Sequence, residues 1–299
     1  MSANLATLLQ SKIINSWNLF WLITLPISTV MVYSMMGVEL SSARVVSSMI
    51  QLSVRCAVPL LFVAFAASSV NVLFPGSFGR WILRNRKFIG LSFAAAMAWQ
   101  LFFILWLVTQ HTEYYVEKVY ALSDVIEGVG GYFLLISMVL TSFKFGRSRL
   151  SAKQWKFLHK SGIYWLWIYA WIAYWWNLFY YNNPNALDYV YYWAGFLAWG
   201  LRMAAWTKKR WPQATGPSTT AGTSQLLYLL PGVAAVATGL ASVSFGSPWG
   251  KQVYEFGFGV PVLNTIGVYT PFFPYVPCFP IFLMMLGACW ILKSRGQPG

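Results

Sequence analysis

The sequence predicts an all-α integral membrane protein with about eight transmembrane helices, and three observations support this fold class. Hydrophobic residues make up 58% of the chain and charged residues only 9%, and the mean hydropathy is +0.55. Apolar runs long enough to cross a bilayer, each of about 20 residues, recur along the chain. No series of alternating polar and apolar segments indicates a membrane β-barrel. A water-soluble domain of 299 residues would not normally combine these features.

Eight apolar runs define the predicted spans. They cover residues 17–37, 45–74, 88–109, 124–143, 161–181, 189–207, 225–245 and 275–292. The second run is too long for a perpendicular crossing, so we expect it to tilt. The predicted domains are a transmembrane core at 1–210, a cytoplasmic linker at 211–224, and two further helices joined by a long non-cytoplasmic loop at 225–299. The linker is rich in proline, glycine, serine and threonine, which is typical of a flexible connection.

The distribution of charge predicts the orientation of these spans. Most of the 21 basic residues fall in the loops on one side, and the positive-inside rule places that side in the cytoplasm. Both termini are then cytoplasmic, and we expect the protein in a bacterial inner membrane. The seven acidic residues fall on the opposite face or at its edge; they are Glu39, Glu113, Glu117, Asp124, Glu127, Asp188 and Glu255. The net charge of +14 therefore reflects topology and contact with the anionic lipids of the bilayer, and predicts no nucleic-acid partner.

Arg55 lies about ten residues inside the second predicted span, at membrane depth. An arginine there costs about 3 kcal/mol on insertion scales, so it requires an anion, backbone carbonyls or water as a partner. Two interpretations stay open. The guanidinium either packs against the carbonyls of a neighbouring helix or helps to bind a ligand.

The chain has two histidines, His111 and His159, and the predicted topology places them at opposite faces of the membrane. They are then separated by about the 30 Å thickness of the hydrocarbon core, so they cannot share a metal ion. They also cannot serve one nucleophile, and no hydrolytic site is predicted. The sequence contains no glycine-rich nucleotide loop, so electrons for any redox reaction would have to come from another polypeptide.

The fifth predicted span is unusually rich in aromatic residues, which continue through its middle. They are Tyr164, Trp165, Trp167, Tyr169, Trp171, Tyr174, Trp175 and Trp176. Interfacial belts explain tryptophan and tyrosine at helix ends but not at mid-span. One interpretation is close packing of rings between helices. The other is a pocket for a flat hydrophobic ligand such as haem, a quinone, a carotenoid or a sterol.

Three stretches carry a resemblance to a known family. They are RCAVPLLFVAFAASSVNVLFPG from Arg55, RWILRNRKFIGLSFA ending at Ala94, and TSFKFGRSRLSAKQWKFLHKSGIYWLWIY from Thr141. Together they resemble the bacterial ferric-reductase-like transmembrane family over about residues 42–207. The resemblance implies a four-helix core that holds one or two b-type haems and passes electrons across the membrane, working with a redox partner. Residues from 211 onward do not share it.

The resemblance also implies ligand positions that this sequence has lost. Family members clamp a deep haem with one histidine in the third span and one in the fifth, and the corresponding residues here are Gln100 and Ile172. Isoleucine has no donor atom, so the deep bis-histidine haem is not expected. Met97 occupies another position where members often carry histidine. Its only partner on the fifth span would be His159, which lies at a different depth.

The sequence therefore leaves two hypotheses. The first is an accessory subunit or lipophilic-ligand-binding protein on a ferric-reductase-like scaffold without the deep haem, in contact with a membrane partner protein. The second is a single-haem electron-transfer protein, and so a ferric-reductase-like oxidoreductase, with haem b on His159 and the second position open or filled by a basic residue near Arg86. A transporter is a weaker third interpretation. The candidate binding residues are His159, Arg86, Arg55, Met97 and Gln100.

Overall fold

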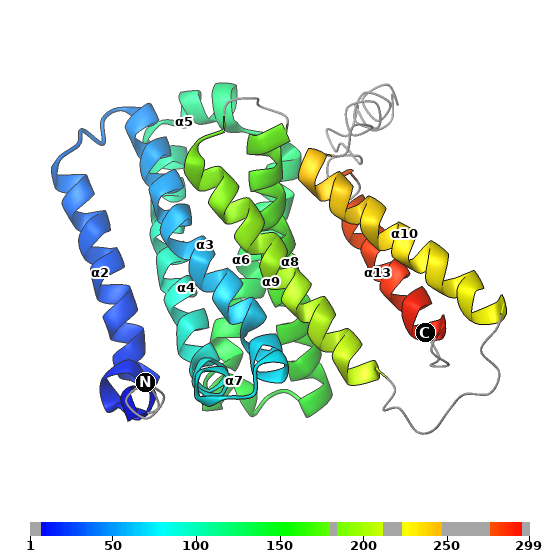
Figure 1. The fold of residues 1–299 in the computed structure, drawn as a ribbon. Helices are drawn as coiled ribbons and strands as arrows, with labels where there is room; N and C mark the ends of the chain where they lie inside the picture. Colours follow the sequence, from blue (N-terminus) through cyan, green and yellow to red (C-terminus); the bar gives the residue numbers. More distant parts are fainter. Residues whose placement is uncertain (1–6, 180–183, 212–222, 247–275, 295–299) are drawn as a thin grey trace. The chain divides into compact units, whose positions relative to one another are not determined.

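The computed structural model describes residues 7–179, 184–211, 223–246 and 276–294, and all regular structure in these ranges is helical (Figure 1). Most of the predicted linker and of the predicted loop before the last helix lies outside the described residues. The fold class is thus confirmed as helical.

Six helices are long and apolar enough to cross a membrane, which confirms a multi-pass membrane protein. They are α2 (Ser16–Met36), α3 (Ala43–Leu73), α4 (Ser77–Gln110), α6 (Leu122–Thr141), α10 (Thr223–Phe245) and α13 (Val276–Ser294). Short helical segments complete the connections: η1 (Lys12–Ile14), α5 (Thr112–Tyr114), η2 (Tyr115–Val119) and α7 (Lys144–Arg147).

Two further helices, α8 (Ala152–Phe179) and α9 (Ala186–Arg210), have 28 and 25 residues. They are long enough to cross a bilayer, but they are not among the six helices that are also apolar enough throughout a span. Charged residues at their ends and many tryptophan and tyrosine residues, whose rings are amphipathic, lower their hydropathy. Six of the eight predicted spans are therefore long and apolar enough to cross a membrane, and the count of eight stays a prediction.

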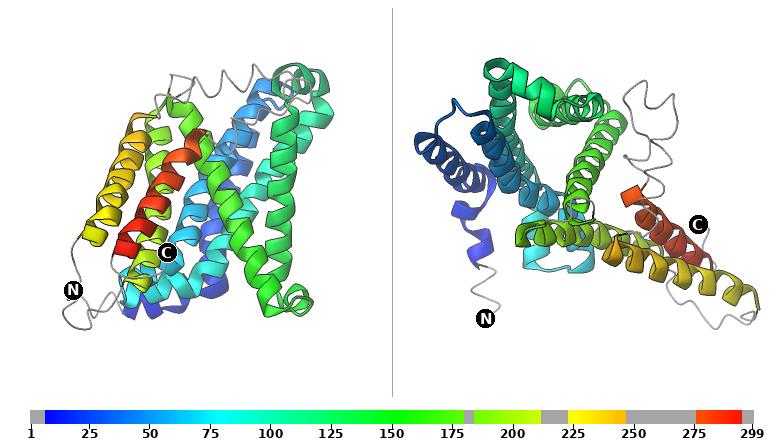
Figure 2. Two further views of the ribbon diagram at one scale, coloured as in Figure 1. Left: turned by 90° about the vertical axis from the view of Figure 1, so that its right-hand side faces the viewer. Right: turned by 90° about the horizontal axis from the view of Figure 1, so that it is seen from above.

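The chain divides into two compact units. The first comprises Met1–Trp171 and Val190–Trp199, and the second comprises Ile172–Tyr189 and Gly200–Gly299. The division falls within helices α8 and α9. In the first unit α3 and α4 pack most extensively, and α2 lies against α4 (Figure 2).

A buried asparagine fixes the start of α2 on α4. Asn85 is fully buried, and its Oδ1 accepts a hydrogen bond from the backbone N–H of Ser16 at 2.9 Å. Its Nδ2 donates to Asn15 Oδ1 at 2.8 Å, and Trp81 Nε1 donates to the carbonyl of Ile14 at 3.0 Å. Ser16 has a φ of 60°, a left-handed backbone that is uncommon for a residue with a side chain. These bonds hold the first turn of α2 in one place.

Helices α3, α8 and α9 meet at Gly195. Trp167 Nε1 donates to the carbonyl of Gly195 at 2.9 Å. A methyl group at Gly195 would lie 2.7 Å from Phe62 and 2.9 Å from Trp171, both aromatic rings. Only glycine fits between them, as is common where helices pack closely in membranes.

The second unit has its own small-residue contact. A Cβ at Gly232 of α10 would lie 3.0 Å from the carbonyl oxygen of Gly287 on α13, so the two backbones touch. In the same unit Asp188 and Asn185 form a capping box at the start of α9, and Asn177 Nδ2 donates to Asp188 Oδ1 at 3.1 Å. Asp188 is thus buried with its polar atoms satisfied.

Replacing Gly195 with alanine should destabilise the protein by about 1–3 kcal/mol, because the new methyl group overpacks two buried rings. Gly90→Ala is the matched control: a Cβ there meets no atom within 4 Å, and we expect no loss of stability. Thermal unfolding of both variants in the same detergent measures the difference. Equal melting temperatures would contradict the packing described at Gly195.

Candidate functional site

Met97 and Gln100, the predicted deep-site residues of α4, are both bonded to one tyrosine of α6. Tyr132 donates its hydroxyl to Gln100 Oε1 at 2.8 Å, and the same oxygen lies 3.2 Å from the carbonyl of Met97. Sequence reasoning missed Tyr132, because no local pattern pairs a tyrosine with a partner 32 residues away. The side-chain oxygen of Gln100 is thus already used inside the protein.

His159, the predicted shallow ligand, lies near the start of α8, before the apolar run that begins at residue 161. Its Nε2 is 3.0 Å from Thr141 Oγ1, and its ring packs on Trp155 with centroids 4.3 Å apart. Partial burial, reinforced by the cations Arg86 and Arg147, lowers the pKa of His159 to about 4. The imidazole is therefore neutral at pH 7.

Arg86 and Arg55 differ in their surroundings. Arg86 Nε donates to the carbonyl of Ala64 at 3.1 Å, so it bonds to the backbone of α3. Arg55 is half-buried, and its own backbone carbonyl accepts a hydrogen bond from Tyr191 at 2.9 Å. In the part of the chain that the structure describes, its guanidinium has no carbonyl partner, so the first interpretation of Arg55 gains no support.

The structure brings some predicted residues together and keeps others apart. Met97 and Gln100 share Tyr132, and Arg86 is close enough to His159 to lower its pKa. Met97 follows Arg86 by eleven residues, about 16 Å along a helix. This spacing agrees with the expected difference in depth between His159 and Met97. Within the described ranges no three histidine, cysteine, aspartate or glutamate side chains form a metal-binding group.

The aromatic residues of α8 fill the interior. The rings of Phe65, Trp167, Trp171 and Tyr192 stack in series, with centroids 5.0, 5.8 and 5.4 Å apart and interplanar angles of 12°, 8° and 15°. All four side chains are buried. These contacts match the packing interpretation of the aromatic span.

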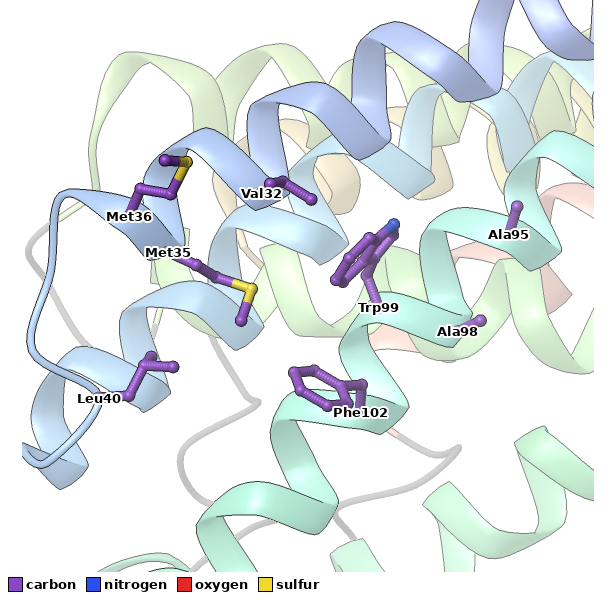
Figure 3. Close-up of a pocket in the computed structure, with 8 residues that line it drawn as sticks. All are labelled: Val32, Met35, Met36, Leu40, Ala95, Ala98, Trp99 and Phe102. Atoms are coloured by element: carbon purple, nitrogen blue, oxygen red, sulfur yellow. The ribbon is translucent and has the colours of Figure 1, made fainter.

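An apolar pocket of about 630 Å³ lies between α2 and α4 (Figure 3). Its lining residues come from α2, from the following connection and from the middle of α4; they are Val32, Met35, Met36, Leu40, Ala95, Ala98, Trp99 and Phe102. We call it the α2–α4 pocket. Its size falls in the range of small-molecule sites.

The two walls of the α2–α4 pocket differ in stiffness. Trp99 is held by a hydrogen bond from its Nε1 to Ser28 Oγ at 3.1 Å, and its ring stacks on Phe103. Met35 and Met36 form the opposite wall, and methionine side chains adapt to irregular shapes. One rigid aromatic wall and one adaptable wall suit a lipophilic molecule.

A second pocket of about 380 Å³ lies on another side of α4, toward α6. Its thirteen lining residues are Trp17, Phe20, Leu91, Ala94, Ala95, Ala98, Leu101, Tyr132, Leu135, Ile136, Val139, Leu140 and Phe143. We call it the α4–α6 groove. Neither pocket is lined by Arg55, Met97 or Trp167.

Comparison with protein-family models, curated proteins and solved structures finds no match for the chain. The ferric-reductase-like resemblance and everything it implies about haem therefore stay predictions.

Replacing Tyr132 with phenylalanine should lower stability by about 0.5–1.5 kcal/mol, because interhelical hydrogen bonds in membranes contribute this much. A double-mutant cycle with Gln100→Leu should show coupling, since the two side chains bond each other. Tyr33→Phe is the matched control, because Tyr33 is 77% exposed. Reversible unfolding in mixed micelles measures the four proteins of the cycle and the control. Strictly additive losses would show that the Tyr132 hydroxyl does not bond Gln100 in solution.

Proposed function

We propose that this protein binds a lipophilic small molecule in the α2–α4 pocket and acts as an accessory subunit in a membrane assembly. The observation that carries the proposal is the pocket itself, which is about 630 Å³ in volume, open on one side and lined by apolar residues. Val32 and Met36 are 47% and 82% exposed, so a ligand can enter sideways from the bilayer. Such a ligand would be one that partitions into lipid, such as a quinone, a carotenoid or a sterol.

The residues present do not fit a deep haem. Gln100 stands where the ferric-reductase-like resemblance implies an axial histidine, and its side-chain oxygen already accepts a hydrogen bond from Tyr132. The aromatic stack through Trp167 and Trp171 takes up interior space that a flat cofactor would need. These two features support a scaffold that works without the deep haem.

We place the protein in a bacterial inner membrane with both termini in the cytoplasm. Support comes from the basic residues, which occur in the first turns of α4, in α7 and the residues after it, in the first turns of α8 and at the end of α9. A membrane partner protein is part of the proposal, because the chain has no nucleotide-binding motif through which it could receive electrons alone.

Filling the α2–α4 pocket should abolish ligand binding. Val32→Trp places a large ring in the pocket, and we expect at least a tenfold loss of affinity, about 1.4 kcal/mol. The matched control is Val30→Trp, because Val30 has nearly the same exposure, 45%, but does not line the pocket. The protein in nanodiscs would be titrated with a quinone, a carotenoid, a sterol and haem b. If none of the four binds the wild type more tightly than it binds Val32→Trp, the proposed function is wrong.

His159 favours a second candidate function, a single-haem electron carrier. Its imidazole is neutral at pH 7, which is the form that ligates iron. Against this candidate, His159 Nε2 already lies 3.0 Å from Thr141 Oγ1. Haem b would therefore have to displace that contact and find its second ligand elsewhere.

A reduced-minus-oxidised visible spectrum of the purified protein distinguishes the two functions. We expect no b-type α-band in the wild type. The electron-carrier function instead requires an α-band that disappears in His159→Ala and persists in His111→Ala, since His111 bonds the carbonyl of Leu40 away from His159. Observation of that pattern would replace the accessory role with electron transfer.

A further inference from the structure

The α4–α6 groove has a charged group at one end and none along its length. Its lining is apolar except for Tyr132 at the deep end, whose hydroxyl is already bonded to Gln100. At the other end Phe143 lines the groove, and Lys87 Nζ lies 5.1 Å from the centre of that ring. The groove therefore has the pattern of an amphiphile site, apolar inside and cationic at its mouth.

The mouth is built from aromatic rings of α2, of α4 and of the connection between α6 and α7. Trp17 packs against Phe20, Phe88 and Phe143, with centroids 5.5, 5.4 and 6.3 Å apart. Trp17 is 43% exposed, and tryptophan is enriched where membrane proteins meet the lipid–water boundary. The ring cluster thus marks the level of the head groups.

The groove has the length of one leaflet. Tyr132 lies nine residues before the end of α6 at Thr141, about 14 Å along a helix, and Phe143 follows two residues later. Half of the hydrocarbon core is about 15 Å. A single acyl chain reaching from the head-group level to the bilayer centre would run along it.

The charge at the mouth has no protein counterion. Lys87 is exposed, and among the described residues no carboxylate pairs with it. The sequence has no acidic residue between positions 40 and 112 or between 128 and 187. These two ranges contain every segment around the mouth except the first turn of α2. That turn and the segment before it, residues 7–20, contain no acidic residue either. The nearest residue in sequence to Phe143 that carries charge is Lys144, also a cation.

We propose that the α4–α6 groove binds one acyl chain of an anionic phospholipid whose phosphate lies against Lys87. The lipid phosphate is then the counterion of Lys87, and the apolar groove provides the surface against which the acyl chain packs. This site adjoins the α2–α4 pocket, with Ala95 and Ala98 of α4 lining both, but the proposal does not depend on the molecule that binds in that pocket.

Photocrosslinking in vesicles tests the proposal with the full-length protein. Two probes carry the same photoactivatable acyl chain, one on phosphatidylglycerol and one on phosphatidylcholine, and peptide mass spectrometry locates the adducts. We expect phosphatidylglycerol to label residues 91–101 and 132–143 at least about fivefold more than phosphatidylcholine, as one basic residue near the surface contributes this factor. Ala94→Leu, which fills the groove, should reduce labelling by both probes.

Charge variants separate this site from general surface attraction. Lys87→Gln should bring the labelling ratio of the two probes close to one, and Lys87→Arg should keep it high. Lys156→Gln removes the same charge from an exposed position of α8 and should leave the ratio unchanged. Equal labelling by both probes in the wild type, an equal effect of Lys87→Gln and Lys156→Gln, or crosslinks of the groove to a second copy of the chain would each overturn the proposal. Melting curves of all variants confirm that they are folded.

Discussion

The position of α2 against α4 depends on the polar contacts of Asn85. Lipid chains are as apolar as leucine, so helices in a membrane are not driven together by the hydrophobic effect. Only 11% of the most apolar stretch of α2 is buried, so packing of its side chains contributes little to holding this helix against the others. The bonds from Asn85 to Ser16 and Asn15 therefore fix one end of this helix. Both apolar pockets have α2 as a wall, and both depend on this attachment.

Two further polar contacts hold α2 near its middle. Thr24 Oγ1 lies 3.3 Å from Ser92 Oγ, and Trp99 Nε1 donates to Ser28 Oγ. The α2 residues that line the α4–α6 groove precede these contacts, and those that line the α2–α4 pocket follow them. Small polar side chains thus hold α2 against α4, and apolar space remains above and below them. A helix held by tight apolar packing along its whole length would leave neither space.

The sequence was sufficient for the class of the protein and for the places where most helices run. Composition alone indicates lipid as the solvent, and in lipid every backbone group must be bonded within a helix or a closed barrel. Gln100 could be singled out because the resemblance names its position, but its bond to Tyr132 could not be predicted. That bond depends on the rotation of α6 about its own axis, which a run of apolar residues does not determine.

The two pockets could not be predicted from the sequence for a related reason. Residues that face lipid and residues that line an apolar pocket have the same composition, so Val32 and Val30 look equivalent until the helices are placed. Asn85 lies in the basic run RNRK, which reads as an exposed loop in the predicted topology. The structure instead places it fully buried within α4. A polar residue inside a charged run gives no local sign of burial.

The aromatic span shows how rings from several helices pack part of the interior. Phe65, Trp167 and Tyr192 come from three different helices and stack with Trp171 in one series. A haem bound between helices contacts each of them through one rigid planar group. The four stacked rings here connect α3, α8 and α9 through dispersion and offset stacking. The hydrogen bond from Trp167 to the carbonyl of Gly195 fixes the orientation of the series. The stacked rings pack this part of the interior, whereas the two pockets described above lie along α4 and are lined in part by exposed residues such as Val32 and Trp17.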